Sequence, residues 1–539
     1  MKKIAKFLIV LGMMGQLSSC DYLDIVPDER AQESDTWKTE GAVRGYLYSC
    51  YGYLPANRTF GNSYWLAEEL TAVTKELFTT FKYGYYSPVS LGFTSNTWST
   101  IWNGIHQCYM FQESLKQVSN EYVTDEMKKQ YLAESNFLIA YYHFLSMRSY
   151  GPTMIIRSVI DLETPISGFP ERSSIDEVVA FINEKLDEAM SEGGLPTTWS
   201  GKDYGRATRL AALALKSRVY LYAASPLYNG NTEMYADFRS PLDGRQLIAQ
   251  EKSQAKWEIS ATQTKYAIDE VEKAKFHLYH DADAGEPSDA KPGLPNKAQR
   301  RLRYTNIDNQ TGNNPEIIWA DTRNDDYYGI QRRCPPRQTL GGKFAGISMT
   351  NCPTLQTIEA LYTKNGLPIN KDKTFDYDER YEYINAPENC DGNNYEDLVK
   401  YANFTPSSDK VMRLCTDREP RFYAWTTYHN GYFEFGKYNN EEISADPAKR
   451  AIRIHLLRDD PHGRGNRTDQ EYSISGFGNK KGVVPSAEWN VIEYPFPLFR
   501  LAELYLNYAE ALVELDRLSE AKVYLDKVRE RAGIPSVDE

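Results

Sequence analysis

Apolar residues recur at helical spacing in the N-terminal half of the chain and again near its end. The clearest segment is 125–150, where Thr124 can cap the first turn and Gly151 can end the helix. The segments 174–190 and 206–224 repeat the pattern. We therefore predict a helix over each segment; the apolar stripe of the first consists of Tyr131, Leu138, Tyr142 and Leu145.

Two more apolar stripes predict a helical hairpin over residues 496–533, with its turn at Asp516. We expect Ser519 to cap the second helix, and Leu518 and Val523 to form a hydrophobic staple. The length of this hairpin and its alanine positions are typical of a tetratricopeptide-type repeat. The helices over 125–150 and 206–224 could supply similar hairpins, with weaker signals.

Between the helical parts, the pattern changes over residues 279–493. Gly, Pro, Asn and Asp become frequent there, and short apolar runs such as Glu316 to Trp319 resemble buried strands. Long loops inside a compact protein usually carry function. We predict a mainly α fold with one domain over 20–539. A helical part over 35–278 and the C-terminal hairpin form its frame, and 279–493 is a long loop-rich excursion from that frame.

The first residues form a secretory signal of the lipoprotein type. The chain begins with three lysines and the apolar run 7–14. Leu17-Ser18-Ser19-Cys20 follows, in which small residues stand directly before a cysteine. This pattern predicts a signal peptide over 1–19 and an acyl anchor such as palmitate on Cys20. An ordinary signal with an accidental cysteine is the alternative. The apolar run is too short to span a bilayer, so a lipid alone would hold the mature chain to a membrane.

Charge and composition narrow the class of ligand. The net charge is −12 and no long basic stripe is present, which makes nucleic acid and anionic lipid surfaces poor partners. The chain has 40 Tyr and 9 Trp. Tyrosine has an apolar face and a polar tip, and so does a sugar ring, so this excess suits a neutral carbohydrate. Most of the tyrosines are nevertheless expected to pack in the core.

The sequence gives little support for catalysis. Neighbouring carboxylates such as Glu68 and Glu69, or Asp325 and Asp326, do not show the opposed geometry that glycoside hydrolysis needs. Nucleophile-elbow, H-E-x-x-H and P-loop patterns are absent from the sequence. We therefore expect a protein that is not an enzyme.

We also expect no metal ion and no other cofactor. The run from Asp281 fails as an EF-hand, because Glu286 and Pro292 stand where Gly and Glu are needed. The acidic turn Asp376, Asp378 and Glu379 could hold a structural calcium ion, but it reads more simply as solvated charge. Besides Cys20 there are six cysteines without metal-ligand spacing, and their possible pairings stay open.

The C-terminal stretch Phe496 to Ala511, FPLFRLAELYLNYAEA, strongly resembles the hallmark of the SusD/RagB family. The likeness continues through Val528-Arg529 and Arg531-Ala532-Gly533. Further segments resemble that family in its order: 142–152, 214–229, 314–319, 353–366 and 417–422.

The resemblance implies an outer-membrane lipoprotein that faces the cell exterior and performs no chemistry. Four tetratricopeptide-like hairpins would pack against a SusC-like TonB-dependent transporter, and the loop-rich side would hold an oligosaccharide for delivery. There are two alternatives. The chain could be a receptor of the same fold for peptide or another non-sugar nutrient, or a scaffold that binds only proteins. The family usually continues past Arg-Ala-Gly with another helical stretch, so we expect a truncated chain at Glu539.

Two aromatic-rich loops are the expected ligand site, because stacking needs exposed aromatic rings beside polar groups. The first, over 57–102, offers Arg58, Trp65, Tyr83 and Tyr85. The second, over 319–333, offers Asp326, Tyr327 and Tyr328. Trp98 and Trp102 lie one helical turn apart and are expected in the core, as is Trp319.

Overall fold

The computed structural model describes most of the chain between residues 37 and 537. The described ranges are 37–55, 69–72, 87, 94–161, 163–280, 283, 297–308, 314–323, 329–336, 349–385, 410–434, 437–438, 441–442, 451–460, 462–465, 472–484 and 493–537.

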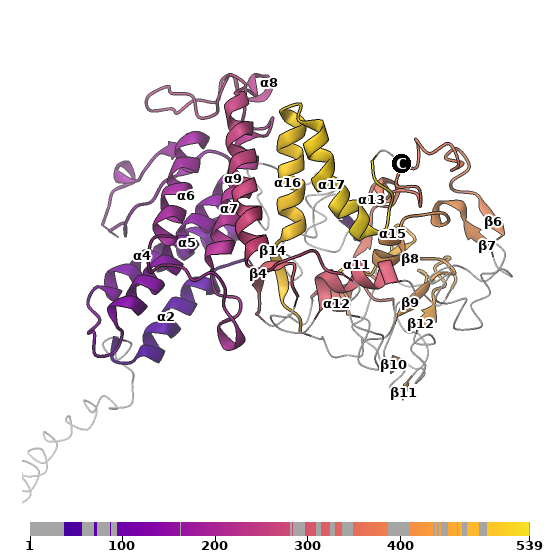
Figure 1. The fold of residues 1–539 in the computed structure, drawn as a ribbon, viewed down its shortest axis with the longest axis horizontal. Coiled ribbons are helices and arrows are strands. Elements are labelled where there is room, and N and C mark those ends of the chain that lie inside the picture. Colours follow the sequence, from indigo (N-terminus) through magenta and orange to yellow (C-terminus); the bar gives the residue numbers. More distant parts are fainter. Residues whose placement is uncertain are drawn as a thin grey trace, which may run out of the picture.

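A row of helices forms the frame, and each helix packs against the next (Figure 1). In order along the row they are α2 (Glu40–Gly52), α4 (Thr94–Leu115), α5 (Asp125–Tyr150), α6 (Ile175–Ala189), α7 (Arg209–Ala224), α9 (Gln254–Lys273), α16 (Leu501–Glu514) and α17 (Leu518–Ala532). Helix α9 contacts α16 directly, although the whole excursion separates them in sequence. The predicted mainly α class is therefore confirmed.

The N-terminal helix predictions hold with one shifted boundary. Helix α5 has the predicted bounds, and the Thr124 hydroxyl accepts the Met127 N–H at 3.3 Å. Helix α6 begins after Ser174, which forms a capping box with Glu177. Helix α7 begins at Arg209 rather than 206, because Thr208 is in extended conformation and caps it instead.

The C-terminal hairpin is present, but its predicted capping is wrong. The turn lies at Asp516, whose φ is 57°, and Arg517 donates its backbone N–H to the Leu512 carbonyl at 2.9 Å. This bond closes the turn early, so α17 begins at Leu518 and Ser519 lies inside its first turn. Leu518 and Val523 are 60% and 54% exposed, so they form no staple.

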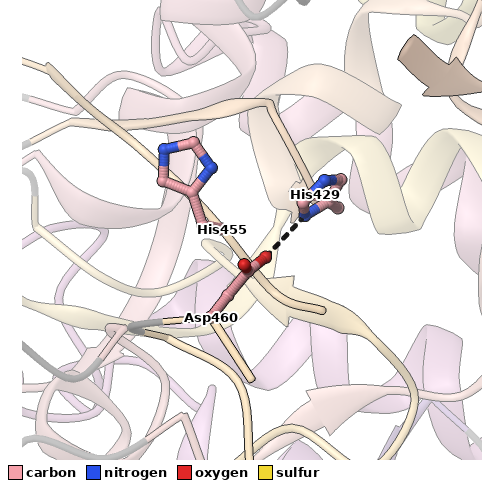
Figure 2. A group of neighbouring side chains, drawn as sticks. All are labelled: His429, His455 and Asp460. Carbon is pink, nitrogen blue, oxygen red and sulfur yellow. Dashed lines mark ion pairs between the residues drawn. The ribbon is translucent and has the colours of Figure 1, made fainter. Parts of the chain in front are cut away.

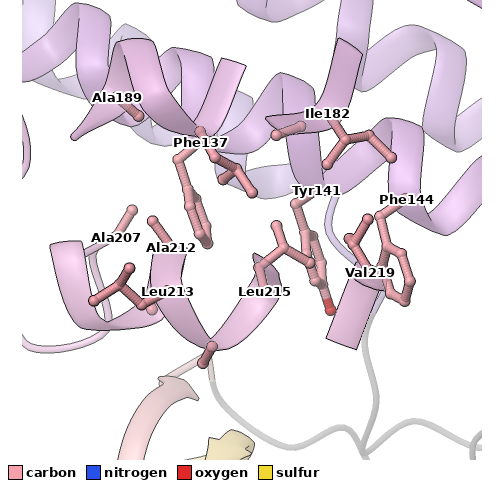
Figure 3. Packing of buried hydrophobic residues seen from close by; sticks show 14 of the residues in the cluster. Phe137, Tyr141, Phe144, Ile182, Ala189, Ala207, Ala212, Leu213, Leu215 and Val219 are labelled. Carbon is pink, nitrogen blue, oxygen red and sulfur yellow. The ribbon is translucent and has the colours of Figure 1, made fainter. Parts of the chain in front are cut away.

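The main core lies where α5, α6 and α7 meet (Figure 3). Phe137, Tyr141 and Phe144 of α5 face alanine and aliphatic side chains of the α7 segment (Figure 3). Trp319 is 3% exposed, meets Phe137 and Tyr141 edge-on, and donates its indole N–H to the Gly205 carbonyl at 2.9 Å. Its predicted burial is confirmed.

Trp98 and Trp102 stand beside this core. They contact each other on α4, with ring centroids 5.3 Å apart, and both are partly buried. Trp102 packs against the main core cluster, as expected from its helical spacing.

Two antiparallel strand pairs join the excursion to the rest of the described chain. Strand β4 (Ile317–Asp321) pairs with β14 (Phe496–Arg500), with irregular register along β14, and β5 (Cys352–Pro353) pairs with β1 (Leu70–Thr71).

The other described elements of the excursion are short. Its helices are α11 (Lys297–Ile307), α12 (Ile330–Arg333), α13 (Leu355–Ala360) and α15 (Pro420–Trp425). Its antiparallel pairs are β6 (Tyr383–Asn385) with β7 (Lys410–Met412), β8 (Thr426–Tyr428) with β13 (Phe477–Asn479), β9 (Tyr432–Glu434) with β12 (Ala451–Arg453), and β10 (Lys437–Tyr438) with β11 (Glu441–Glu442).

Buried arginines stabilise the excursion, which has only short strands, by donating hydrogen bonds to its backbone carbonyls. Arg303 is 1% exposed and donates to the carbonyls of Val483 and Ala424. Arg418 donates to carbonyls in α13 and after it, and burial lowers its pKa to about 10. A buried carbonyl needs a donor, and the planar guanidinium supplies several at once.

A buried carboxylate ties the excursion to the C-terminal hairpin. Glu316 is fully buried and accepts from Arg500 at 2.6 Å, from Arg531 at 2.5 Å and from the backbone N–H of Tyr279 at 2.9 Å. Burial by itself raises a carboxyl pKa, but the charges of Arg531 and Arg500 outweigh it here. The pKa of Glu316 is therefore lowered.

The five cysteines within the described ranges are free and buried: Cys50, Cys108, Cys334, Cys352 and Cys415. Burial raises the pKa of Cys334 to about 12, which keeps that thiol protonated and unreactive at neutral pH. Among the described helices, none has the length and apolar character needed to cross a bilayer.

We predict that Glu316→Gln destabilises the protein by about 3–5 kcal/mol, because it leaves the buried guanidinium of Arg531 and the partly buried one of Arg500 without their counter-charge. Glu184→Gln is the control, since the Glu184–Arg157 pair is exposed and should contribute less than about 1 kcal/mol. Urea unfolding followed by circular dichroism measures both changes. Equal, small effects of the two substitutions would show that the Glu316 cluster does not hold the fold.

The same cluster predicts a loss of stability in acid. A carboxyl whose folded pKa is lowered stabilises the fold above its unfolded pKa, near 4.5, and this contribution disappears as pH falls through the folded pKa. The difference in unfolding free energy between wild type and Glu316→Gln should therefore be largest near neutral pH and shrink below about pH 4.5. A constant difference from pH 7 to pH 3 would contradict this assignment.

Candidate functional site

All the sequence-predicted site residues lie outside the described ranges. This holds for the lipidation residue Cys20 and for the seven ligand-binding candidates, which are Arg58, Trp65, Tyr83, Tyr85, Asp326, Tyr327 and Tyr328. They remain predictions, and the described residues next to them show where the two loops begin.

One arginine brings the starting points of the two predicted loops together. The guanidinium of Arg323 donates to the carbonyls of Leu54 at 2.8 Å and Pro55 at 2.9 Å, and Asp321 holds it by an ion pair at 2.7 Å. The segment 56–68 follows Pro55 directly, and 324–328 follows Arg323 directly. Segments far apart in sequence thus leave the described structure from one place.

The first loop is also fixed after residue 68. Strand β1 pairs with β5, so Leu70 lies opposite Pro353. The carbonyl of Glu69 accepts from the Thr354 N–H and the Thr357 hydroxyl, both at 3.0 Å. These bonds fix the backbone of Glu69 at the rim of a pocket.

This first pocket has a volume of about 460 Å³ and lies between the helical frame and the excursion. Its wall combines aromatic rings with cationic, acidic and amide side chains. The lining includes Tyr141, Tyr222, Tyr494, Phe496, Arg148, Arg218, Arg500, Lys481, Glu69, Glu503, Asn306 and Asn507. Mixed apolar and polar linings of this size are typical of small-molecule sites.

The charged groups on the frame side of this pocket are held in fixed orientations. Arg218 binds Glu503 through two nitrogens, at 2.5 and 2.6 Å, and donates to the Leu498 carbonyl at 2.8 Å. Its guanidinium carbon lies 4.1 Å from the centroid of the Phe499 ring. Because both oxygens of Glu503 accept from Arg218, this carboxylate is suited to a fixed polar wall rather than to proton transfer.

A second pocket of about 340 Å³ adjoins the first, and both are lined by Glu69 and Lys481. The Lys481 ammonium lies 3.5 Å from Glu69 and 4.9 Å from the centroid of Trp425. Trp425 is partly buried and lines the second pocket with Gln356, Arg421 and Asn479. The Glu69–Lys481 pair therefore stands where the two pockets meet.

Sequence reasoning missed most of these pocket residues. Glu69, Trp425 and Lys481 come from three distant parts of the chain, and none belongs to a motif with a known spacing. Only Glu69 was singled out, as one of two neighbouring carboxylates. A single sequence carries no signal that would bring these three residues together.

Three side chains converge as possible metal ligands at the edge of the excursion (Figure 2). His429, His455 and Asp460 each offer a ligand atom within 4.8 Å of the others. The acidic turns considered from sequence use their carboxylates locally. Asp376 accepts the backbone N–H of Glu379 at 3.3 Å, and Asp283 accepts that of His280 at 2.7 Å.

Two family models match the chain and together cover most of it. The model described as the SusD family matches residues 315–539, and the one described as starch-binding associating with outer membrane matches residues 21–221. A comparison with curated proteins gave no match.

The fold is similar to several solved structures. The protein BT4246 is 27% identical, with a TM-score of 0.75, over 93% of this chain and 83% of the other. A SusD-like protein from Bacteroides fragilis, BF3747, is 19% identical, with a TM-score of 0.65, over 95% and 82%. A laminarin-binding SusD-like protein is 17% identical, with a TM-score of 0.51, over 93% and 85%.

Proposed function

The chain belongs to the SusD/RagB family, and from this premise we propose that it binds an oligosaccharide at the cell surface and delivers it to a SusC-like TonB-dependent transporter. It carries out no chemistry on this ligand. The acyl chain on Cys20 tethers it to the outer membrane, facing the cell exterior. The association of the family with starch binding and the outer membrane supports both the ligand class and the location.

The observation that carries this proposal is the pair of adjoining pockets. Their walls alternate aromatic faces, such as Tyr222 and Trp425, with amide and charged groups. A sugar ring can rest its apolar face on an aromatic ring while its hydroxyls bond to the polar groups. Two pockets in sequence suit an oligomer better than a single sugar. One protein of this fold binds laminarin, so the fold is compatible with a polysaccharide ligand.

The predicted tyrosine loops belong to the same proposal. Arg323 holds their starting points together, and Glu69, directly after residue 68, lines both pockets. We propose Tyr83, Tyr85, Tyr327 and Tyr328 as additional stacking surfaces for the same ligand.

The outer face of the C-terminal hairpin supports the proposed protein partner. Leu506 and Val513 on α16, and Leu518 and Val523 on α17, are between 42% and 60% exposed. Apolar side chains gathered on one exposed hairpin are typical of protein contacts. We therefore propose this helical side as the surface that contacts the transporter.

The alternatives are a peptide or other non-sugar nutrient as ligand, and a scaffold that binds proteins only. Calorimetry of the chain from Asp21 onward against glycan pools and peptide pools separates the two nutrients. Capture of the transporter by a protein that binds neither pool would favour the scaffold.

We predict that Tyr83→Ala and Tyr327→Ala each weaken glycan binding about 5- to 100-fold, because a lost stacking contact and its buried area are worth roughly 1–3 kcal/mol. Affinity electrophoresis in glycan gels measures the change, and circular dichroism checks folding. Wild-type affinity in both folded variants would remove these loops from the binding site.

We predict that Glu69→Gln and Lys481→Met each weaken glycan binding about 10- to 100-fold, because hydrogen bonds to charged groups contribute roughly 1.5–3 kcal/mol. Stability should change by less than about 1 kcal/mol, since this ion pair is partly exposed. Lys364→Met is the matched control, because Lys364 forms an exposed pair with Asp417 away from both pockets. Equal affinities of Lys481→Met and Lys364→Met would exclude the pockets as the glycan site.

A further inference from the structure

Three of the seven histidines of the chain gather around one extended hairpin of the excursion. Strand β9 pairs with β12, and the pairing continues past the strands, because Ile454 donates to the Gly431 carbonyl at 2.8 Å and Asn430 to the Ile454 carbonyl at 2.7 Å. This register puts His429 next to His455 across the hairpin, with ring centroids 6.1 Å apart.

A tight loop after β12 brings a carboxylate to the two rings. The Asp460 side chain accepts the Leu457 N–H at 2.9 Å, and the Gly463 N–H bonds back to the Asp460 carbonyl at 3.0 Å. A Cβ atom on Gly463 would lie 1.9 Å from the Leu457 carbonyl oxygen, so only glycine fits this loop without a shift. The backbone thus fixes the place of Asp460.

Nδ1 of His429 and Oδ2 of Asp460 lie close together inside this cluster. The Leu456 N–H donates to Nδ1 of His429 at 3.1 Å, so this nitrogen is an acceptor and holds no proton. Oδ2 of Asp460 is also an acceptor, and it lies 3.4 Å from that nitrogen. A protonated His429 could pair with Asp460 but could not accept from Leu456. A cation that binds both atoms would take the His429 lone pair from the Leu456 N–H and offset the charge of the Asp460 carboxylate.

His455 is the third residue of the cluster, and contacts with His462 hold His455 in position. The His455 N–H donates to Nδ1 of His462 at 3.0 Å, and their rings lie nearly parallel, with 13° between the planes. Because Nδ1 of His462 accepts this hydrogen bond, it carries no proton. The His455 ring itself makes no hydrogen bond to any residue that the structure describes, so its nitrogens are available.

We propose that His429, His455 and Asp460 bind a divalent transition-metal ion, with Zn²⁺ the best fit. Ligand atoms around a tetrahedral zinc ion, each about 2.0–2.1 Å from the metal, lie about 3.4 Å apart. The His429–Asp460 distance of 3.4 Å already meets this spacing. The ligand atom of His455 lies within 4.8 Å of the other two and would move closer to them when the ion binds. Two imidazoles and one carboxylate favour zinc over calcium or magnesium, which prefer oxygen ligands.

The ion would fasten the loop 457–465 to the turn between β8 and β9. The three ligands are partly buried, so an ion can enter from solvent, and water can complete the coordination. Binding replaces the Leu456 N–H at Nδ1 of His429. This site lies apart from both pockets, whose linings include none of its residues, and it does not depend on the glycan proposal.

Calorimetric titration with Zn²⁺ tests the site on untagged protein from Asp21 onward, after treatment with a chelator. We expect one zinc ion per chain, and at least a tenfold weaker affinity in His429→Gln, His455→Gln and Asp460→Asn. The asparagine keeps an acceptor for the Leu457 N–H, so this variant preserves the loop. His277→Gln is the matched control, since His277 also lies 3.4 Å from an aspartate, Asp283, but belongs to no group of three converging ligands among the described residues.

Replacement of zinc by Co²⁺ reports the ligand type through its visible absorption, which should disappear in the two cluster histidine variants and persist in His277→Gln. Failure of folded wild-type protein to bind zinc would overturn the proposal. So would affinities within twofold of wild type in all three cluster variants, equal loss in His277→Gln, or displacement of Co²⁺ by equimolar Ca²⁺.

Discussion

The ion cluster around Glu316 is the constraint on which the rest of the structure depends. Its partners come from three places: Tyr279 where the excursion leaves the frame, Arg500 where it returns, and Arg531 near the end of α17. The Leu501 N–H also bonds to the Glu316 carbonyl. Removing Glu316 would leave the buried Arg531 guanidinium without its counter-charge. The cluster therefore couples the closing of a very long chain segment to the docking of the last hairpin.

This closure also creates the candidate site. Once β4 and β14 are paired, α16 can pack on α9 and α7, and Glu503 at its start meets Arg218 of α7. The first pocket lies along this junction, with Arg500 in its wall. Arg500 thus belongs to the cluster and to the pocket, so the shape of the pocket depends on an intact cluster. Binding and folding share a residue here, which is why Glu69 and Lys481 are better probes of binding.

The sequence predicts the frame well, because frame helices depend on local patterns. Thr124 and Ser174 cap the helices expected of them, and the apolar spacing of 125–150 identifies a core helix. The prediction for Ser519 failed because Asp516 and Arg517 close the turn one step earlier, through a bond that no local pattern shows. The contacts of Glu316 and of Lys481 span hundreds of residues, and one sequence holds no trace of such pairs. The prediction of the tyrosine loops, by contrast, rests on composition, and those tyrosines lie outside the described ranges.

The excursion shows what stabilises a long segment that has neither long helices nor a wide sheet. Hydrophobic clusters in it are small, and its strands are two or three residues long apart from β4, so few backbone groups find partners in a ladder. Charged side chains take over that role: Arg303 and Arg418 satisfy carbonyls, and Asp460 satisfies a backbone N–H. Each such group must be buried or fixed at a cost in desolvation, which a counter-charge offsets. Glu316 has its two arginines. At the proposed metal site, a bound cation would supply the counter-charge to the Asp460 carboxylate, whose Oδ2 lies 3.4 Å from Nδ1 of His429, by the same physical rule that holds the rest of the excursion in place.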